Sequence, residues 1–274
     1  MFDWLFGNEK KKIPQDLHNE SFIMNELERL LNYFQDVTGM DFSHKKDVLM
    51  GKLTLFCHHN DIYSFDELLK LCKKNNDIEH KLIDYLTINE TYFNREYPQI
   101  KALSSMIKES PTKVDILSLP CSSGEEVYTI LIELLEAGIS SEQVSLTGFD
   151  INSTIIEKAR SGLFSERSLH RVEQNIITKY FQKEEQNYKI NDRLKYIPHF
   201  SVQSIFALTH EKKYDYIFCR NLLIYFDEET KKKAIRSLMS LLKEDGKLFL
   251  GHSDHVDETL GLETVYAYGT KFYK

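Results

Sequence analysis

The sequence has no run of about 18 consecutive apolar residues, the length that a membrane-spanning helix requires. It has few cysteines, and their wide spacing is typical neither of a disulfide framework nor of a Cys-x-x-Cys zinc site: Cys57, Cys72, Cys121 and Cys219. It also lacks a basic N-terminal segment followed by an apolar stretch and a cleavage site, which is the pattern of a secretory signal. We therefore expect a reduced, cytoplasmic protein.

Several ligand-binding signatures are missing too. The chain contains no Gly-Lys-Ser/Thr phosphate loop and no Gly-x-Gly-x-x-Gly dinucleotide fingerprint. Its net charge of -7 gives no overall attraction to nucleic acid, and it has no Asn/Asp-Pro-Pro-Tyr segment. His252 and His255 have a His-x-x-His spacing, but no third ligand is evident. We expect neither a nucleic-acid partner nor a metal.

The chain divides into three predicted segments. Residues 1–19 form a tail that contains Phe2, Trp4 and three lysines. This tail is either a frayed end whose aromatic residues pack locally, or a short segment that docks weakly on a partner or an anionic membrane surface. Residues 20–96 repeat leucine and phenylalanine at helical spacing, which predicts a small all-α domain. Residues 97–274 form the third segment.

Strands and helices alternate in this third segment. The pattern predicts strands at 114–119, 144–150, 214–221 and 246–252, and helices at 125–136, 153–160 and 228–242. A turn at 243–246 precedes the fourth strand, and a hairpin closes the chain at 264–273. This order predicts an α/β fold with a mainly parallel sheet and an antiparallel terminal edge strand. The polar stretch 165–200 interrupts the alternation.

The first strand-turn-helix unit has the pattern of a cofactor site. Between Leu119 and Tyr128 the sequence reads LPCSSGEEVY, and its small residues let a ligand approach the backbone beside the first helical amides. Asp150 ends the next strand, where an acid that accepts both hydroxyl protons of a ribose belongs. The alternative for Asp150 is an acid that only caps the following helix. The small-residue turn at 121–124 favours the first interpretation, in which Asp150 binds a nucleotide-type cofactor.

Six segments, in order, resemble one known family. They are TINETYFNRE at 87–96, CSSGEEVY at 121–128, FDI at 149–151, KARSG at 158–162, IFCRNLLIYF at 217–226 and GHS at 251–253. From about Asn25 onward the chain is similar to the chemotaxis receptor methyltransferases, the CheR family. The resemblance implies a Rossmann-like class I methyltransferase domain, a small all-α N-terminal domain and a β-subdomain inserted at 165–200. It also implies S-adenosylmethionine-dependent esterification of glutamate side chains on cytoplasmic helices of chemoreceptors.

The resemblance implies roles for individual residues. Arg95 is the main candidate for substrate handling, because a guanidinium can orient a carboxylate through two hydrogen bonds, and Tyr225 would form a wall of the methyl-transfer site. The implied cofactor-binding residues are Asn89, Thr91, Arg95, Gly124, Glu125, Asp150, Ser204, Ile205, Asn221 and Leu222. Glutamate is already ionised near neutral pH, so the reaction needs little acid-base machinery.

The chain departs from the family pattern at several places. Val127 replaces a proline, Pro120 replaces a small residue, and Ser204 stands where asparagine is common. Residues 97–100 read Tyr-Pro-Gln-Ile where the family commonly has a His-Phe pair, which affects the expected substrate surface more than the cofactor site. Because the stretch 182–200 contains no glycine, we expect no tight binding of an isolated C-terminal receptor pentapeptide.

Two alternatives stand beside a chemoreceptor methyltransferase. The first is a homologous methyltransferase of another chemosensory system, or one with a different protein substrate. The second is a non-catalytic protein that binds S-adenosylmethionine or S-adenosylhomocysteine and signals to a partner. The presence of Arg95, Glu125, Asp150 and Tyr225 favours catalysis, whereas the altered 97–100 segment is compatible with an unusual partner.

Overall fold

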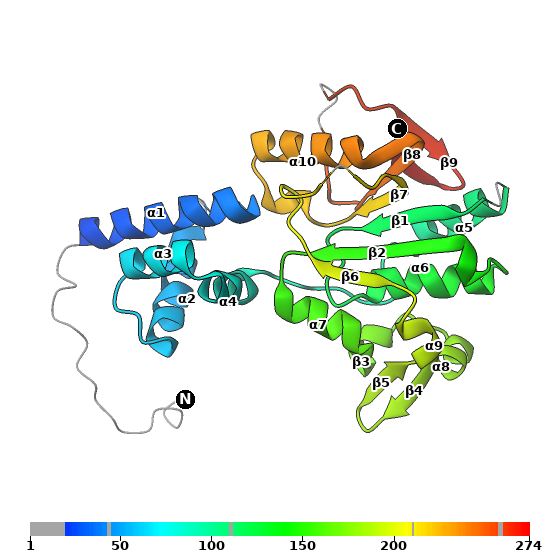
Figure 1. Ribbon diagram of the computed structural model, residues 1–274, viewed down its shortest axis with the longest axis horizontal. Helices are drawn as coiled ribbons and strands as arrows, with labels where there is room; N and C mark the ends of the chain where they lie inside the picture. The colour runs from blue at the N-terminus through cyan, green and yellow to red at the C-terminus, as the bar shows by residue number, and fades with distance from the viewer. Residues whose placement is uncertain (1–19, 43–44, 110–111, 210, 257–259) are drawn as a thin grey trace.

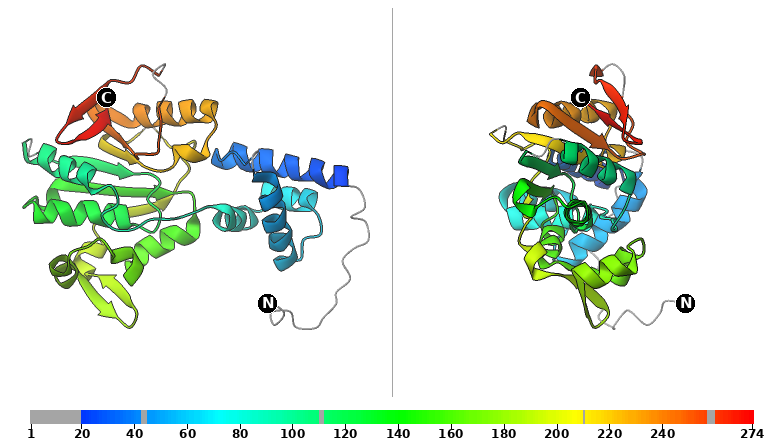
Figure 2. Two further views of the ribbon diagram at one scale, coloured as in Figure 1. Left: turned by 180° about the vertical axis from the view of Figure 1, so that it is seen from behind. Right: turned by 90° about the vertical axis from the view of Figure 1, so that its right-hand side faces the viewer.

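A helical part and a sheet-containing part are joined by an extended segment, residues 87–96 (Figure 1). The two parts lie at opposite ends of the long axis of the molecule, and the linking segment runs from one to the other (Figure 2). The computed structural model describes residues 20–42, 45–109, 112–209, 211–256 and 260–274. The prediction for the tail, residues 1–19, therefore falls outside the described residues.

The helical part has the all-α character that the sequence predicts. Its helices are α1 (Glu20–Thr38), α2 (Lys46–His59), α3 (Phe65–Lys74) and α4 (Asn76–Leu86). Their apolar residues recur at helical spacing, so each helix turns one face to a common core. The side chains of Ser64 and Asn75 accept backbone N–H bonds at the starts of α3 and α4, which fixes where these two helices begin.

A seven-stranded sheet forms the second part, in the order β6-β2-β1-β7-β8-β10-β9. Its strands are β1 (Val114–Ser118), β2 (Val144–Asp150), β6 (His199–Val202), β7 (Tyr214–Cys219), β8 (Leu242–Leu250), β9 (Thr264–Ala267) and β10 (Thr270–Tyr273). The first five in this order are parallel, whereas β10 pairs antiparallel with β8 and β9. The predicted fold class is confirmed. The strand order changes direction between β1 and β7, which creates a crevice at their carboxyl ends.

Helices cover both faces of this sheet (Figure 1). The helices α5 (Tyr97–Glu109), α6 (Glu125–Glu136) and α7 (Ser153–Ser161) pack with one face, and α10 (Glu228–Leu241) packs with the other. Alternate residues of β7 serve the two cores: Ile217 lies in the core that α10 shares with the helical part, and Phe218 in the core beneath α5 and α6. The ring of Phe218 stacks on Phe249 at a centroid distance of 4.6 Å.

The stretch 165–200 contains most of a small inserted sheet, with the order β3-β5-β4. Its elements are β3 (Leu163–Ser165), α8 (Gln174–Tyr180), β4 (Phe181–Glu184), β5 (Asn187–Ile190) and α9 (Asp192–Lys195). Aromatic rings attach it to the rest of the protein, because Phe164 and Phe181 meet the ring of Phe93 at 4.8 and 5.2 Å. The first strand begins at Leu163, two residues before the predicted insert.

The predicted turn at 243–246 is wrong. Strand β8 begins at Leu242, directly after α10, and continues through these residues. A bulge absorbs them, because Leu242 lies opposite Tyr214 and the next paired residue of β8 is Lys247, opposite Tyr216. Within the bulge, Lys243 forms ion pairs of 2.7 Å with Asp215 on the adjacent strand β7 and 3.1 Å with Asp115 on β1, the strand beyond it. These contacts link residues that are far apart in the sequence. They help to keep residues 243–246 in a strand, although their composition is typical of a turn.

The helical part is anchored to the start of α7 by one carboxylate. Asp84, on α4, accepts backbone hydrogen bonds from Ser153 at 2.9 Å and from Thr154 at 3.1 Å. It also accepts the hydroxyl protons of both residues, at 2.9 and 2.7 Å. Asp84 therefore supplies, from another helix, the acceptor that the orphan N–H groups of a helix start require.

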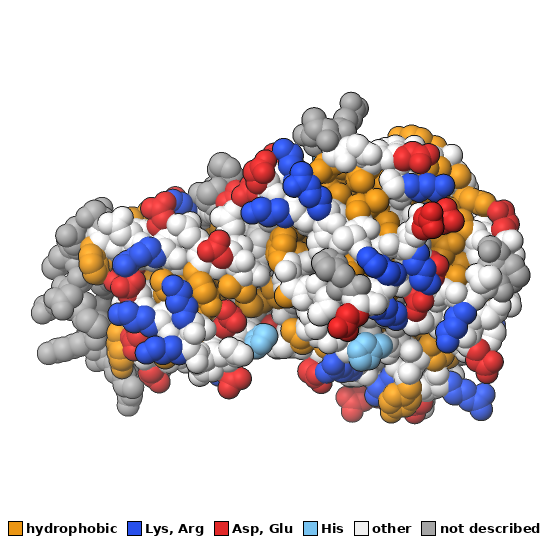
Figure 3. Space-filling model, turned by 45° about the horizontal axis from the view of Figure 1, so that its top comes forward, with side chains coloured by type: hydrophobic (Ala, Val, Ile, Leu, Met, Phe, Trp, Pro, Cys, Tyr) orange, Lys and Arg blue, Asp and Glu red, His pale blue; other side chains and the backbone are white. Residues whose placement is uncertain are grey.

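Both signs of charge occur on one face of the protein. On the face shown in Figure 3, lysine and arginine side chains are interspersed with acidic ones over both parts. Orange apolar patches lie between them. Among the described residues, no helix is long and apolar enough to cross a membrane.

The Asp84 contact predicts a measurable loss of stability. We expect Asp84→Ala to lower the free energy of unfolding by about 1–2 kcal/mol, the range for loss of a helix-start acceptor, as measured by urea denaturation. Lys81→Ala changes an exposed residue of the same helix and serves as the control. Equal stability of the two variants would contradict the anchoring role.

Candidate functional site

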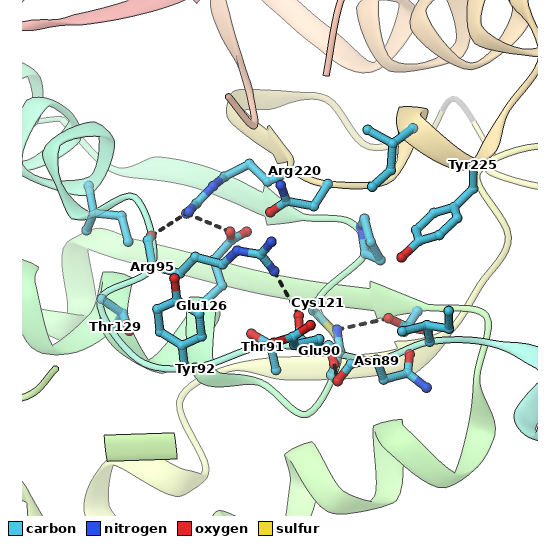
Figure 4. A pocket seen from close by; sticks show the side chains of 17 residues that line it. Asn89, Glu90, Thr91, Tyr92, Arg95, Cys121, Glu126, Thr129, Arg220 and Tyr225 are labelled. Carbon is cyan, nitrogen blue, oxygen red and sulfur yellow. Dashed lines mark hydrogen bonds and ion pairs between the residues drawn. The ribbon is translucent and has the colours of Figure 1, made fainter. Parts of the chain in front are cut away.

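A cavity of about 210 Å³ opens at the carboxyl ends of β1, β2 and β7, beneath the linking segment. Figure 4 shows the side chains around it. Residues of three origins line it: the linking segment, the turn after β1 together with the end of β2, and the loop after β7. This is the crevice in which the parallel sheet topology places ligands.

About half of the predicted site residues line this cavity. Those on its wall are Asn89, Thr91, Arg95, Asp150, Asn221 and Tyr225. The remaining predicted residues are absent from the wall: Gly124, Glu125, Ser204, Ile205 and Leu222. Of these, Ile205 and Leu222 are buried in the core that α10 shares with the helical part. The structure thus brings the first group together at the cavity and leaves the second out of its lining.

Asp150 presents a buried carboxylate to the cavity. One of its oxygens accepts the backbone N–H of Ser122 at 2.9 Å, and the other accepts that of Asn152 at 3.0 Å. Burial raises the pKa of Asp150 to about 6, and these hydrogen bonds oppose the rise. A carboxylate offers about four lone-pair positions, so each oxygen can accept one further proton. Asp150 can therefore accept both hydroxyl groups of a ribose diol.

Glu125 is the first residue of helix α6, next to Glu126 in the cavity lining, and is only 3% exposed. Burial raises the pKa of its carboxyl, while hydrogen bonds from the side chains of Ser123 and Ser168 oppose the rise. The preceding residue, Gly124, has φ +92°, a left-handed conformation that side chains rarely adopt. A Cβ at Gly124 would also lie 3.1 Å from the Cβ of Ala159, a tight contact, so the backbone conformation and the packing both favour glycine here.

Hydrogen bonds fasten the linking segment over the strand ends. The side chain of Asn152, beyond β2, donates to Thr87 at 2.8 Å, and the backbone N–H of Asn94 donates to Thr129 of α6 at 3.2 Å. Between these points the segment also receives the hydroxyl of Ser122, which donates to the carbonyl of Asn89 at 3.5 Å. The linking segment is therefore held by residues of three elements: the turn after β2, helix α6 and the turn after β1.

A buried cation, Arg220, holds the other end of the linking segment. Its guanidinium lies 2.8 Å from the Glu126 carboxylate and 3.5 Å from that of Glu96, and its side chain is only 3% exposed. It also donates to the backbone carbonyl of Arg95 (Figure 4). Sequence reasoning gave Arg220 and Glu126 no role, although both lie within the segments that carry the resemblance and both line the cavity. Because Arg220 and Glu126 are 94 positions apart, no local sequence pattern predicts their pairing.

Arg95 and Tyr225 face each other across the cavity (Figure 4). One guanidinium nitrogen of Arg95 donates to the carbonyl of Glu90 at 2.8 Å, which leaves other N–H groups for a ligand. Burial raises the pKa of Tyr225, and the nearby Arg95 cation opposes this rise. Ile88 and Ile224 also line the cavity, and both are exposed, at 58% and 48%. The site thus combines a cation, a phenol and two apolar side chains at its mouth.

The thiols and histidines near the site show no sign of other chemistry. Burial raises the pKa values of Cys121 and Cys219 well above the ordinary value, so both thiols are protonated near neutral pH. Within the part of the chain that the structure describes, no group of three His, Cys, Asp or Glu residues could hold a metal ion. The loop after β7 is instead shaped by Asp254, whose carboxylate accepts the N–H groups of Asn221 and Leu223 at 2.5 and 2.9 Å.

Comparison with known proteins identifies the family. Residues 89–268 match the family described as "CheR methyltransferase, SAM binding domain", and residues 25–87 match "CheR methyltransferase, all-alpha domain". The chain belongs to the CheR methyltransferase family. It is 33% identical to a chemotaxis protein methyltransferase of Campylobacter jejuni over 269 residues, 97% of this chain and 99% of the relative.

Two further relatives of this CheR protein have slightly lower sequence identity. Chemotaxis protein methyltransferase 2 of Vibrio cholerae is 32% identical, covering 90% of this chain and 91% of the relative. The corresponding protein of Escherichia coli is 30% identical, covering 82% and 83%. The predictions of an S-adenosylmethionine-dependent methyltransferase of the chemotaxis class, and of S-adenosylmethionine as its cofactor, are confirmed.

The buried cation predicts a large effect on stability. We expect Arg220→Leu to lower the free energy of unfolding by about 3–5 kcal/mol, because the change leaves Glu96 and Glu126 close together without their partner. Urea denaturation at pH 7 measures this, with Arg236→Leu, an exposed residue of α10, as the control. A loss below about 1 kcal/mol would show that the network does not depend on Arg220.

Proposed function

We propose that this CheR protein methylates glutamate side chains on the cytoplasmic helices of methyl-accepting chemoreceptors, and that it acts in the cytoplasm. One observation carries the proposal. A single cavity at the sheet crevice gathers an acid able to bind a ribose, Asp150, and a cation able to orient a carboxylate, Arg95. An enzyme that transfers a methyl group from a nucleoside cofactor to an acidic side chain needs both residues in one place.

The chain's residues divide the work as follows. Asp150 would hold the ribose, and Asn89, Thr91 and Asn221 offer polar groups to the rest of the cofactor. Glu125 and Gly124 would act at the amino end of the methionine. Ser204, Ile205 and Leu222 would support the adenine and methionine pockets. S-adenosylmethionine supplies a sulfonium methyl group, which a carboxylate oxygen can accept without a proton transfer.

Arg95 and Tyr225 would act on the substrate. The guanidinium of Arg95 would orient the incoming glutamate through two hydrogen bonds, and Tyr225 would close the opposite wall. The apolar side chains of Ile88 and Ile224 at the mouth of the cavity would exclude water from the substrate carboxylate. Water stabilises the charge of a carboxylate and so slows its attack on the methyl group. No base is required, because glutamate is ionised near neutral pH.

The proposal also includes the division of the chain and its peptide contacts. Residues 20–96 would form the all-α domain, 97–274 the methyltransferase domain and 165–200 the inserted subdomain. In the insert, β4 and β5 are joined by a two-residue turn, 185–186, and the stretch 182–200 has no glycine. We propose that an isolated C-terminal receptor pentapeptide is not bound tightly, and micromolar binding in calorimetry would contradict this.

Methyl transfer tests the proposed reaction. Labelled methyl from S-adenosylmethionine should pass to membranes that carry the organism's chemoreceptors and be released by alkali as methanol, the signature of a carboxyl ester. Arg95→Lys should lower kcat/KM by about 10- to 100-fold although it keeps the charge, because an ammonium cannot form the forked pair of hydrogen bonds. Arg236→Lys, on exposed α10 surface, is the matched control.

Activity of Arg95→Lys close to that of the wild type would remove Arg95 from substrate handling. If the wild-type protein transfers no label while its binding of S-adenosylhomocysteine is intact, the proposed reaction is wrong. That result would favour a non-catalytic sensor or a different protein substrate.

The raised pKa of Asp150 predicts a pH dependence of cofactor binding. The ribose diol donates to the ionised carboxylate, so binding is strongest above a pH of about 6 and weakens as the pH falls through that value. We expect the Kd of S-adenosylhomocysteine, measured by calorimetry from pH 8 to pH 5, to rise at the acid end. Asp150→Asn should weaken binding at pH 8 by about 10- to 100-fold and remove most of the step. A Kd that is equal at pH 5 and pH 8 would contradict the role.

A further inference from the structure

A second cavity, of about 420 Å³, adjoins the first. One side is formed by Asn89, Glu90, Thr91 and Tyr92 of the linking segment, and these four residues also line the first cavity. The other side comes from the end of β3 and the turn after it: Ser165, Arg167, Ser168, His170 and Arg171. We call this second cavity the arginine cleft. The linking segment thus lies between the first cavity and two arginines of the second.

Positive charge dominates the lining of the arginine cleft. Arg167 and Arg171 are exposed, and neither forms an ion pair with any carboxylate among the described residues. Glu90 is the one acid that lines the cleft among those residues. In a chain of net charge -7, two unpaired guanidinium groups in one concave site point to an acidic ligand.

The arginines stand on a fixed frame. The backbone N–H of Phe93 donates to the carbonyl of Ser168 at 3.0 Å, and the side chain of Asn94 donates to the carbonyl of Arg171 at 3.0 Å. The guanidinium of Arg171 lies 4.8 Å from the ring centroid of Tyr92, within the range of a cation–π contact. Such preorganisation lowers the entropy lost when a ligand is bound. The cleft is therefore tied to the same linking segment that carries Arg95.

We propose that the arginine cleft binds a second carboxylate of the methyl-accepting helix, one that flanks the glutamate being methylated. This inference rests on the proposed function and specifies its substrate class as acidic stretches of helix. Residues three or four apart lie on the same face of a helix, so one face can present one carboxylate to Arg95 and another to Arg167 and Arg171. The cleft thus selects sites with a neighbouring acid.

The test separates receptor binding from cofactor binding. Initial rates of label transfer to receptor-bearing membranes are measured for the double variant Arg167→Gln/Arg171→Gln as the receptor concentration is varied. We expect KM for the receptor to rise by about 3- to 30-fold, the effect of losing two exposed charge pairs, with kcat little changed. The dependence of KM on salt should become weaker, because fewer charges remain to be screened. The affinity for S-adenosylhomocysteine, measured by calorimetry, should be unchanged.

A matched variant and a receptor variant complete the design. Arg193→Gln removes an exposed arginine of the same insert that lines neither cavity, and it should leave KM unchanged. Changing the flanking receptor acid to glutamine should raise KM for the wild-type enzyme, with little further effect on the double variant, because both changes remove the same interaction.

The outcomes are distinguishable. An unchanged KM in the double variant, with normal transfer by the wild type, overturns the arginine cleft and leaves the proposed function standing. A fall in the affinity for S-adenosylhomocysteine that matches the rise in KM also overturns it, because the arginines then serve the cofactor. Absence of transfer by the wild type overturns the proposed function and the cleft together.

Discussion

The geometry of the site depends on one buried guanidinium. Arg220 follows β7, reaches Glu126 on α6, and donates to the carbonyl of Arg95 on the linking segment. A charge removed from water at this depth is tolerated only when its partners are close, and here two carboxylates and a carbonyl supply them. The segment that brings Arg95 over the strand ends is therefore fixed by the sheet beneath it.

Buried acids give the region its electrostatic character. Burial raises the pKa values of Glu125, Asp150 and Asp254, and backbone N–H groups stabilise the ionised forms of all three. The lining of the cavity nevertheless carries both signs of charge, because Glu90, Glu126 and Asp150 share it with Arg95 and Arg220.

The sequence predicted the fold well where local pattern and packing agree. The strand 144–150 and the helix 125–136 were predicted with the bounds that the structure has, because a buried parallel strand reads as an apolar run and a covering helix repeats every 3.6 residues. Helix α5 and strand β6 were not predicted. Strand β6 is four residues long and, among the described residues, pairs with β2 alone at the sheet edge, so its sequence carries little signal.

The site was predictable in part for a related reason. Asp150 could be placed because it ends a strand near a small-residue turn, which is a local pattern. The Asp84 contact to α7 joins residues 69 and 70 positions apart, and Arg220 meets the Arg95 carbonyl across 125 positions. Neither contact has a signature in the residues around it. The turn expected at 243–246 failed in the same way, because pairing with β7 and ion pairs to Asp115 and Asp215 involve residues far away in the sequence.

The central claim is that the cavity beneath the linking segment holds the cofactor and receives the substrate carboxylate. A crystal structure of the protein with S-adenosylhomocysteine tests it most directly. We expect the ribose hydroxyls within hydrogen-bond distance of Asp150, and the sulfur in the part of the cavity between Arg95 and Tyr225. A ligand bound away from Asp150, or a sulfur that faces away from Arg95, would contradict the account.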